Sequence, residues 1–251
     1  MGYVHIPNLP QSRTSLAVVD GRIDGDLEER LRSLNIELIK TVRHADLYEE
    51  VSCHPDMMLH HLGDEYMVYA PGVDEKVLQA LSEHGFKLIQ GDTCLAAKYP
   101  GDIAYNVARV GKFAFHNLKY TDKVLERELK RRGVQLVHVK QGYTKCSVSV
   151  VDENSIITAD KGIAAAALEK GLEVLQIEPE DAILLPGLSN GFIGGSTAML
   201  DRRTWAVTGR FSLLKASDRI SKFLGDRNIR ILSLSDKDIV DIGTILPLKA
   251  K

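Results

Sequence analysis

The sequence predicts an α/β fold in which five units of strand, strand, helix and strand form a ring that the C-terminal strand closes. Five short runs share one pattern of apolar, charged or amide, apolar, apolar and polar residues, as expected for closing strands of repeated units. These runs are IELIKTV from Ile36, FKLIQGD from Phe86, VQLVHVK from Val134, LEVLQIE from Leu172 and IRILSLS from Ile229.

Two columns of capping residues run in register with these strands. The residue before each run is always Gly or Asn, the residues that tolerate the left-handed end of a helix: Asn35, Gly85, Gly133, Gly171 and Asn228. About ten residues upstream of each run stands an aspartate suited to cap a helix N-terminus: Asp24 or Asp26, Asp74, Asp122, Asp160 and Asp218. Each closing strand is therefore expected to follow a capped helix.

The first unit lacks one strand. Ser15–Val19 is a strand, Asp20 and Gly21 form a turn, and Leu27, Leu31 and Leu34 form a helical stripe before the closing strand. The β-rich run Ile242–Leu248 at the far end of the chain is expected to pair with Ser15–Val19, which would leave no unpaired sheet edge there.

Units two to five each begin with a hairpin. The expected hairpin strands are Met57–Gly63 with Glu65–Ala70, Ile103–Val110 with Lys112–Leu118, Cys146–Val151 with Ser155–Thr158, and Gly191–Leu200 with Thr204–Gly209. The helices that follow have an apolar face at Val77, Leu78 and Leu81, a charged span at Lys123–Arg132, an alanine-rich span at Ile163–Leu168, and an apolar face at Ile220, Phe223 and Leu224. Ile183–Pro186 is a short apolar link before the last unit.

Composition limits the function classes. The 251 residues are 44% apolar and 26% charged, with a net charge of −2, which gives no electrostatic argument for nucleic acid or an anionic membrane. Three widely spaced cysteines form neither a metal motif nor a disulfide framework, and no signal-peptide core or membrane-length apolar run is present. We expect one cytoplasmic domain over residues 1–251 without metal or cofactor, and leave open a homo-oligomer.

Candidate site residues come from where each hairpin starts, because equivalent positions of a ring of repeats converge on its axis. They are His54, Asp56, Asp102, Asn106, Cys146, Gly194, Gly195 and Ser196. Asp56 and Asp102 each closely follow a proline, which makes them repeat equivalents. Carboxylates can hold a guanidinium in bidentate hydrogen bonds, and a thiolate can attack its central carbon. GFIGGS, at residues 191–196, lacks the lysine and spacing of a phosphate loop, so nucleotide binding is rejected.

Each candidate also has a structural interpretation. Asp56 and Asp102 could be turn residues, Cys146 a buried small hydrophobe, and His54 a residue of a surface loop. The pair Gly194 and Gly195 could permit close backbone packing at the axis.

Three motifs, HPDMMLHHLGDEYMVYAPG, KCSVSVVDENSIITADKGI and GFIGGS, carry a family resemblance. Over essentially its whole length the chain resembles the pentein or GME (amidinotransferase-like) superfamily, and within it an uncharacterised bacterial GME-fold domain family. The resemblance implies a five-bladed α/β propeller. Catalytic penteins, which include deiminases, dimethylarginine hydrolases and amidinotransferases, attack guanidino compounds with a cysteine of the last unit, assisted by a histidine and acidic residues. Here the last unit presents Gly194, Gly195 and Ser196, and the available thiol, Cys146, lies one unit earlier.

Two hypotheses follow from the resemblance. The first is an enzyme acting on a small cationic, guanidino-type molecule, a hydrolase or transferase, with Cys146 as nucleophile, His54 as acid/base, and the other candidates binding substrate. The second is a non-catalytic pentein that binds a small ligand or a protein partner, as the superfamily's ribosome-binding initiation factor does. A lowered thiol pKa at Cys146 would favour the enzyme, and an inert buried thiol the binding protein.

Overall fold

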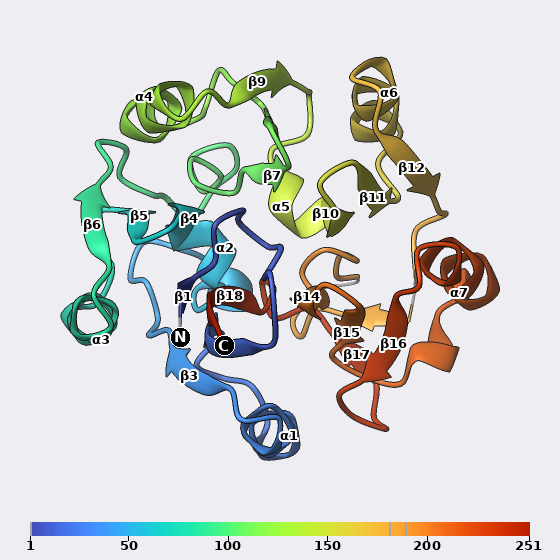
Figure 1. The fold of residues 1–251 in the computed structure, drawn as a ribbon. Coiled ribbons are helices and arrows are strands. Elements are labelled where there is room, and N and C mark those ends of the chain that lie inside the picture. The colour runs from blue at the N-terminus through green and yellow to red at the C-terminus, as the bar shows by residue number, and fades with distance from the viewer. Residues whose placement is uncertain (1, 181, 189) are drawn as a thin grey trace.

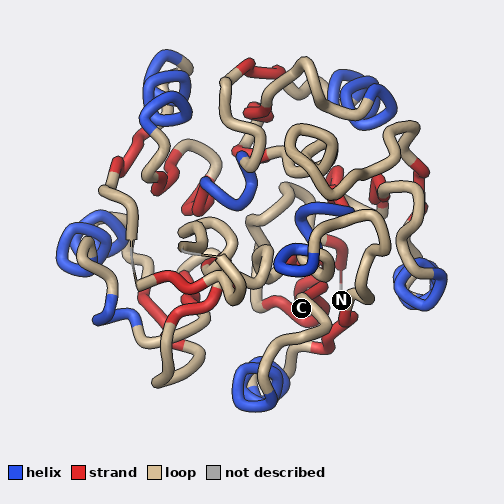
Figure 2. Tube along the Cα trace, turned by 180° about the vertical axis from the view of Figure 1, so that it is seen from behind, coloured by secondary structure: helices blue, strands red, loops and turns tan. Residues whose placement is uncertain are grey.

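The computed structural model describes residues 2–180, 182–188 and 190–251, and they form a mixed α/β fold of five similar units. In Figure 1 the long helices lie on the periphery, and most of the strands lie further in, around a common centre. Figure 2 shows the same arrangement from behind, with both termini near the centre. Each unit has its own sheet, a small two-stranded sheet is added to these five, and none of the sheets formed by the described residues closes on itself.

Each unit's sheet has a first, a second and a closing strand, and in units two to five all three come from the unit itself. The first hairpin strands of units two to five are β4 (Leu59–Gly63), β7 (Ala108–Val110), β10 (Val148–Asp152) and β14 (Thr197–Asp201). The second strands of all five units are β2 (Thr14–Val19), β5 (Tyr66–Tyr69), β8 (Phe113–His116), β11 (Ser155–Thr158) and β15 (Thr204–Val207). The closing strands are β3 (Glu37–Lys40), β6 (Lys87–Gln90), β9 (Gln135–His138), β12 (Glu173–Gln176) and β16 (Arg230–Ser233). First and second strands pair antiparallel, and second and closing strands pair parallel, so the repeat order predicted from sequence is confirmed.

The C-terminal strand supplies the missing strand of unit one. β18 (Leu246–Ala250) pairs antiparallel with β2, and β1 (Gly2–Tyr3) adds to its other edge. The predicted partner of Ser15–Val19 is therefore confirmed, although the strand begins at Leu246 rather than Ile242. Gly243 and Thr244 have positive φ (62° and 77°), and this bend delays the start of the strand.

The capping columns are confirmed with one exception. The helices are α1 (Gly25–Ser33), α3 (Glu75–Glu83), α4 (Lys123–Arg131), α6 (Lys161–Glu169) and α7 (Ser217–Gly225). The N-cap residues of the first four are the predicted aspartates, and each side chain accepts a hydrogen bond from a backbone N–H of the first turn: Asp24, Asp74, Asp122 and Asp160. Asp218 was predicted wrongly, because it lies inside the first turn of α7 and Ala216 holds the cap position.

The C-terminal column is confirmed throughout. All five residues have positive φ, namely Asn35 (61°), Gly85 (83°), Gly133 (71°), Gly171 (79°) and Asn228 (55°). The left-handed residue lets the chain leave the helix and turn into the closing strand.

Two predicted strands begin with a helical turn instead. α2 (Pro55–Met58) and α5 (Thr144–Ser147) precede β4 and β10, so Met57 and Cys146 are helical. In α2, proline at the first helical position favours the turn, because its fixed φ suits the helix and its missing N–H is not needed there. The strands expected to start at Ile103 and at Gly191 also begin later, at Ala108 and Thr197.

The remaining elements are short. They are the two-residue strands β13 (Ile183–Leu184) and β17 (Ile239–Val240), which pair parallel, and the single-turn helices η1 (Glu49–Val51) and η2 (Phe211–Leu213). Four apolar clusters fill the space between neighbouring sheets and between the sheets and their helices. No described helix is both long enough and apolar enough to cross a membrane.

Candidate functional site

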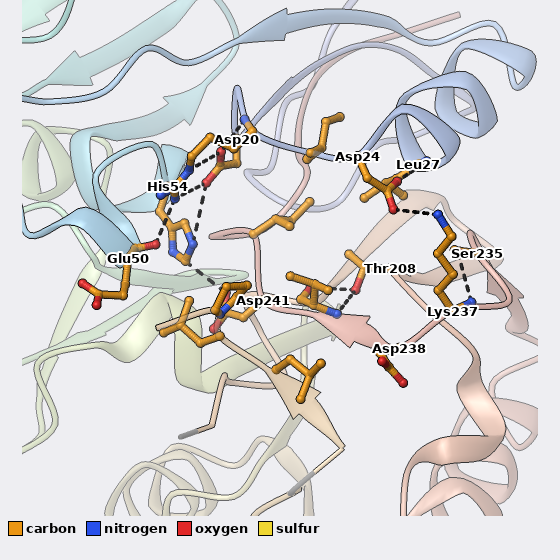
Figure 3. Close-up of a pocket in the computed structure, with 17 residues that line it drawn as sticks. Asp20, Asp24, Leu27, Glu50, His54, Thr208, Ser235, Lys237, Asp238 and Asp241 are labelled. Atoms are coloured by element: carbon orange, nitrogen blue, oxygen red, sulfur yellow. Dashed lines mark hydrogen bonds and ion pairs between the residues drawn. The ribbon is translucent and has the colours of Figure 1, made fainter. Parts of the chain in front are cut away.

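A cavity of about 480 Å³ opens between unit one and unit five (Figure 3). We call it the His54 cavity. Its polar lining comes from the ends of several elements: Asp20 directly follows β2, His54 precedes α2, Thr208 follows β15, and Asp241 follows β17. Its apolar lining is Ile23, Leu27, Leu184, Leu185, Pro186, Val240 and Ile242, and the other polar residues are Arg22, Asp24, Glu50, Ser235, Lys237 and Asp238.

Asp20 is buried and held by Arg22. Its Oδ1 accepts from the Arg22 backbone N (2.7 Å) and Nε (3.1 Å), and its Oδ2 accepts from Nη2 (2.7 Å). This hydrogen bonding raises the pKa of Arg22. The guanidinium also donates to the carbonyl oxygens of Glu49 (2.6 Å) and Glu50 (2.9 Å), so its donors are largely used by the protein itself.

His54 lies between two carboxylates (Figure 3). Its Nε2 is 3.8 Å from Asp20 Oδ2 and its Nδ1 is 3.9 Å from Asp241 Oδ1, both too long for a hydrogen bond. The side chain is buried, and within the described part of the chain Nδ1 has no hydrogen-bond partner. Gly243 packs directly on it, and a Cβ at Gly243 would lie 2.3 Å from the His54 Cβ. An imidazole held in this way can take or give a proton at the cavity wall.

Asp241 is fixed by backbone donors. Its Oδ2 accepts from the N–H of Phe192 (2.8 Å) and its Oδ1 from the N–H of Gly243 (3.0 Å). A Cβ at Gly195 would lie only 1.9 Å from Oδ1, so only glycine leaves room for this carboxylate. The predicted close packing at Gly194 and Gly195 is confirmed, since a Cβ at Gly194 would meet three carbonyl oxygens within 2.6 Å.

A second polar group lies at the centre of the molecule, and we call it the axial cluster: Asp56, Asn106, Lys145, Cys146 and Thr244. The Cys146 thiol donates to Asp56 Oδ2 (3.2 Å), and Asn106 Nδ2 donates to its Sγ (3.1 Å). Lys145 Nζ donates to Thr244 Oγ1 (3.0 Å) and to the Gly194 carbonyl (3.3 Å). All five side chains are buried.

Burial dominates the ionisation of the axial cluster. Desolvation raises the pKa of Asp56 to about 6, even though Lys145 opposes the shift. The same loss of water lowers the pKa of Lys145 and raises that of the Cys146 thiol well above its ordinary value. The thiol is therefore protonated at neutral pH, so the structure does not supply the lowered pKa that would favour a nucleophile. The cavity beside Asp56 measures about 20 Å³, room for one water molecule.

The predicted site residues thus separate into two groups. Asp56, Asn106 and Cys146 are in contact, and the backbone N–H of Gly195 donates to the Cys146 carbonyl (3.1 Å). His54 instead lines the larger His54 cavity. The Ser196 hydroxyl donates to the backbone carbonyl oxygens of Phe192 (3.1 Å) and Ile193 (3.2 Å).

Asp102 belongs to neither group. Its Oδ2 accepts from the Tyr143 hydroxyl, and burial raises the pKa of its carboxyl group. It was wrongly matched to Asp56: Asp56 precedes the first strand residue Leu59 by three positions, whereas Asp102 precedes Ala108 by six. The nearby prolines suggested that Asp56 and Asp102 are equivalent, but the two residues lie at different distances from the start of their strands.

The sequence interpretation missed Asp20, Glu50, Lys145 and Asp241. Asp20 was assigned only to a turn, yet it follows the run SLAVV directly, and side chains at the carboxyl end of a buried strand commonly line a site. No sequence signal marks Asp241, because its role depends on a contact with Gly195 far away in the chain.

The comparisons with known proteins agree with this fold. The model of a family of unknown function, DUF6873, matches residues 18–246. The chain belongs to this family. No curated protein sequence matches the chain.

Solved structures of similar fold have little sequence in common with it. They include SxtG, an amidinotransferase of saxitoxin biosynthesis from Microseira wollei, with 11% identity, 92% of this chain and 91% of that chain covered, and a TM-score of 0.58. An inosamine-phosphate amidinotransferase from Streptomyces griseus has 9% identity, coverage of 94% and 92%, and a TM-score of 0.58. A substrate-bound agmatine deiminase from C. jejuni has 11% identity, coverage of 99% and 96%, and a TM-score of 0.59. At such identities the likeness establishes the pentein-type fold.

Proposed function

We propose that this protein is a five-bladed α/β propeller that binds a small organic cation of the guanidino type in the His54 cavity. The observation that carries the proposal is the charge of the lining. Five carboxylates line the cavity, at Asp20, Asp24, Glu50, Asp238 and Asp241, against the two cations Arg22 and Lys237. Both cations are already paired with carboxylates of the protein. The surplus negative charge favours a cationic ligand.

The fold relatives support the guanidino group in particular. They include amidinotransferases and an agmatine deiminase, and agmatine carries a guanidino group. A planar guanidinium offers paired donors that match a carboxylate. Asp241, held rigid by two backbone N–H groups, and the unpartnered Nδ1 of His54 are the acceptors we assign to it.

No cysteine lines the His54 cavity among the residues the structure describes. Covalent attack by a thiolate on a ligand held there therefore lacks its nucleophile. The cavity residues themselves provide acceptors for a cation and, at His54, a group that can exchange a proton. Binding is the function that this arrangement supports best.

Isothermal titration calorimetry with butylguanidine tests the proposal. We expect saturable binding that weakens at least tenfold in Asp241→Asn, because the buried acceptor loses its charge. The matched control is Asp46→Asn, an exposed aspartate outside the cavity, which should bind like the wild type. Absence of binding to the wild type, or equal affinity in Asp241→Asn, would contradict the proposal.

A second candidate is a guanidine-modifying enzyme with Cys146 as nucleophile and His54 as acid/base. Its support is the contact of Cys146 with Asp56 (3.2 Å) and Asn106 (3.1 Å), which gives the thiol an adjacent base and an amide donor. This candidate requires Cys146 to become accessible. Iodoacetamide labelling followed by mass spectrometry distinguishes the two candidates. The enzyme candidate predicts that added butylguanidine changes the labelling rate of Cys146. The binding proposal predicts slow labelling with and without the ligand.

A further inference from the structure

The His54 cavity has acidic side chains at two ends. Figure 3 shows His54, Asp20 and Asp241 at one end, which we call the inner end, and Asp24, Lys237 and Asp238 at the other, the outer end. Both ends can therefore contribute to binding the same ligand.

Each end has more negative than positive charge. At the inner end Arg22 is paired with Asp20. Among the described residues Glu50 then has no lysine, arginine or histidine within ion-pair distance, and Asp241 has only His54. At the outer end Lys237 Nζ lies 2.5 Å from Asp26 and 3.4 Å from Asp24. The exposed Asp238 forms no ion pair with any residue in the described ranges 2–180, 182–188 and 190–251.

A second, independent feature marks the inner end as a place for a ligand. The His54 side chain is 1% exposed, and its Nδ1 has no hydrogen-bond partner among the residues that the structure describes. A buried polar atom without a partner costs free energy, and a ligand N–H group at this position would satisfy it.

The cavity also has an apolar wall. Leu27, Leu184 and Ile242 are among the apolar residues that line it, and methylene groups of a ligand packed against them would be removed from water. The wall thus fits an alkyl chain rather than a second polar group.

We infer that the ligand is a linear dication, an alkyl chain with a cationic nitrogen at each end as in α,ω-diamines, and that the cavity disfavours amino acids. This inference rests on the proposed function, since it specifies the ligand of the same cavity. An α-carboxylate at the outer end would meet Asp24 and Asp238, and the one lysine there is already paired. The same charge pattern that attracts a second amine repels a carboxylate.

Three matched probes test the inference by calorimetry at low salt. Pentylamine has one cation, 1,5-diaminopentane adds a second at the other end, and lysine adds a carboxylate to that diamine. We expect 1,5-diaminopentane to bind about tenfold more tightly than either pentylamine or lysine. Equal affinity of pentylamine and the diamine, or lysine as tight as the diamine, overturns the inference.

A variant pair locates the second cation. Asp238→Asn should weaken the binding of 1,5-diaminopentane about threefold and leave pentylamine unchanged, because only the diamine reaches the outer end. The control is Asp236→Asn, an exposed aspartate two residues away that does not line the cavity. Equal losses for both ligands in Asp238→Asn would overturn the inference.

The two proposals fail in different ways. If butylguanidine binds but the diamine shows no advantage over pentylamine, the cavity binds a single cation and only this inference is wrong. If neither butylguanidine nor any of the amines binds, the proposed function is wrong as well.

Discussion

The axial cluster and the His54 cavity lie side by side and contain the same kinds of side chain. Gly243 packs on His54, and the adjacent Thr244 accepts from Lys145, so one stretch of chain borders both. Among the described residues the axial cluster leaves one buried acceptor unpaired, Asp56 Oδ1, but it borders a cavity of only about 20 Å³, whereas His54 and the carboxylates beside it face about 480 Å³. The comparison teaches that convergence of polar residues on an axis does not make a ligand site. A cavity large enough to admit the ligand is needed as well.

Removing β18 should have the largest effect, because it affects both regions. Truncation after Asp241 removes Gly243 and Thr244 as well as the strand that pairs with β2. We expect loss of cooperative unfolding, measured by circular dichroism during urea titration, since a sheet edge and the core below it become exposed. A truncated chain that unfolds like the full chain would contradict the ring-closure account.

Gly195→Ala should separate the two regions. The new Cβ would collide with Asp241 Oδ1 at 1.9 Å, so the carboxylate or the backbone must move. We expect a loss of about 1–3 kcal/mol in the free energy of unfolding together with weaker butylguanidine binding. Gly225→Ala is the control, because a Cβ there meets nothing within 4 Å. Unchanged stability and binding in Gly195→Ala would show that the packing between Gly195 and Asp241 is looser than described.

Burial of titratable groups around the axial cluster should also make the stability of the protein depend on pH. Burial lowers the pKa of His60, which borders the cavity beside Asp56, to about 3. A lowered folded-state pKa adds stability that is present above the unfolded value of 6.5 and is lost as the pH falls towards 3. Between pH 7 and pH 5 this one group should remove about 2 kcal/mol from the free energy of unfolding.

His60→Gln tests this value. The variant should lose about 2 kcal/mol less free energy of unfolding than the wild type between pH 7 and pH 5. Burial lowers the pKa of His61 and of His116 to about 4, so in the variant these residues should still make the free energy of unfolding fall at acid pH. Asp56 acts in the opposite sense. Its pKa is raised to about 6, so its contribution is present at low pH and is lost as the pH rises through 6. A variant with the same pH slope as the wild type would show that His60 is not held neutral by burial.

The smallest expected effect lies outside both regions. Gly171→Ala should cost about 1 kcal/mol, because φ is 79° and a Cβ there meets nothing within 4 Å, so only backbone strain acts. Gly133→Ala, with φ of 71° and the same open space, should match it. Thermal denaturation checks both, and an alanine that stabilises either position would contradict the left-handed cap.

The sequence predicted the fold well because its signals are local and repeated. Caps such as Asp160 and Gly171 act within one turn of chain, and five copies in register made them recognisable. Asp218 failed because its helix starts one residue before it, a boundary that propensity does not determine. The helical turn at Cys146 was missed for a similar reason, since a short apolar run is compatible with either structure.

The site was less predictable because its determinants are distant in the chain. The sequence correctly selected residues that converge, and the contact of Cys146 with Asp56 confirms that two of them meet. It could not show that burial would raise the pKa of this thiol or that His54 would face Asp20 and Asp241. Charge and solvent access depend on packing between units, and no local pattern encodes them.

A crystal structure of the protein with butylguanidine tests the central claim most directly, because it shows where the cation binds without any substitution. The account predicts density for the guanidinium in the His54 cavity, within hydrogen-bond distance of Asp241 or His54, and an unchanged axial cluster. Density for the ligand against Asp56 and Cys146, with the His54 cavity empty of it, would contradict the account.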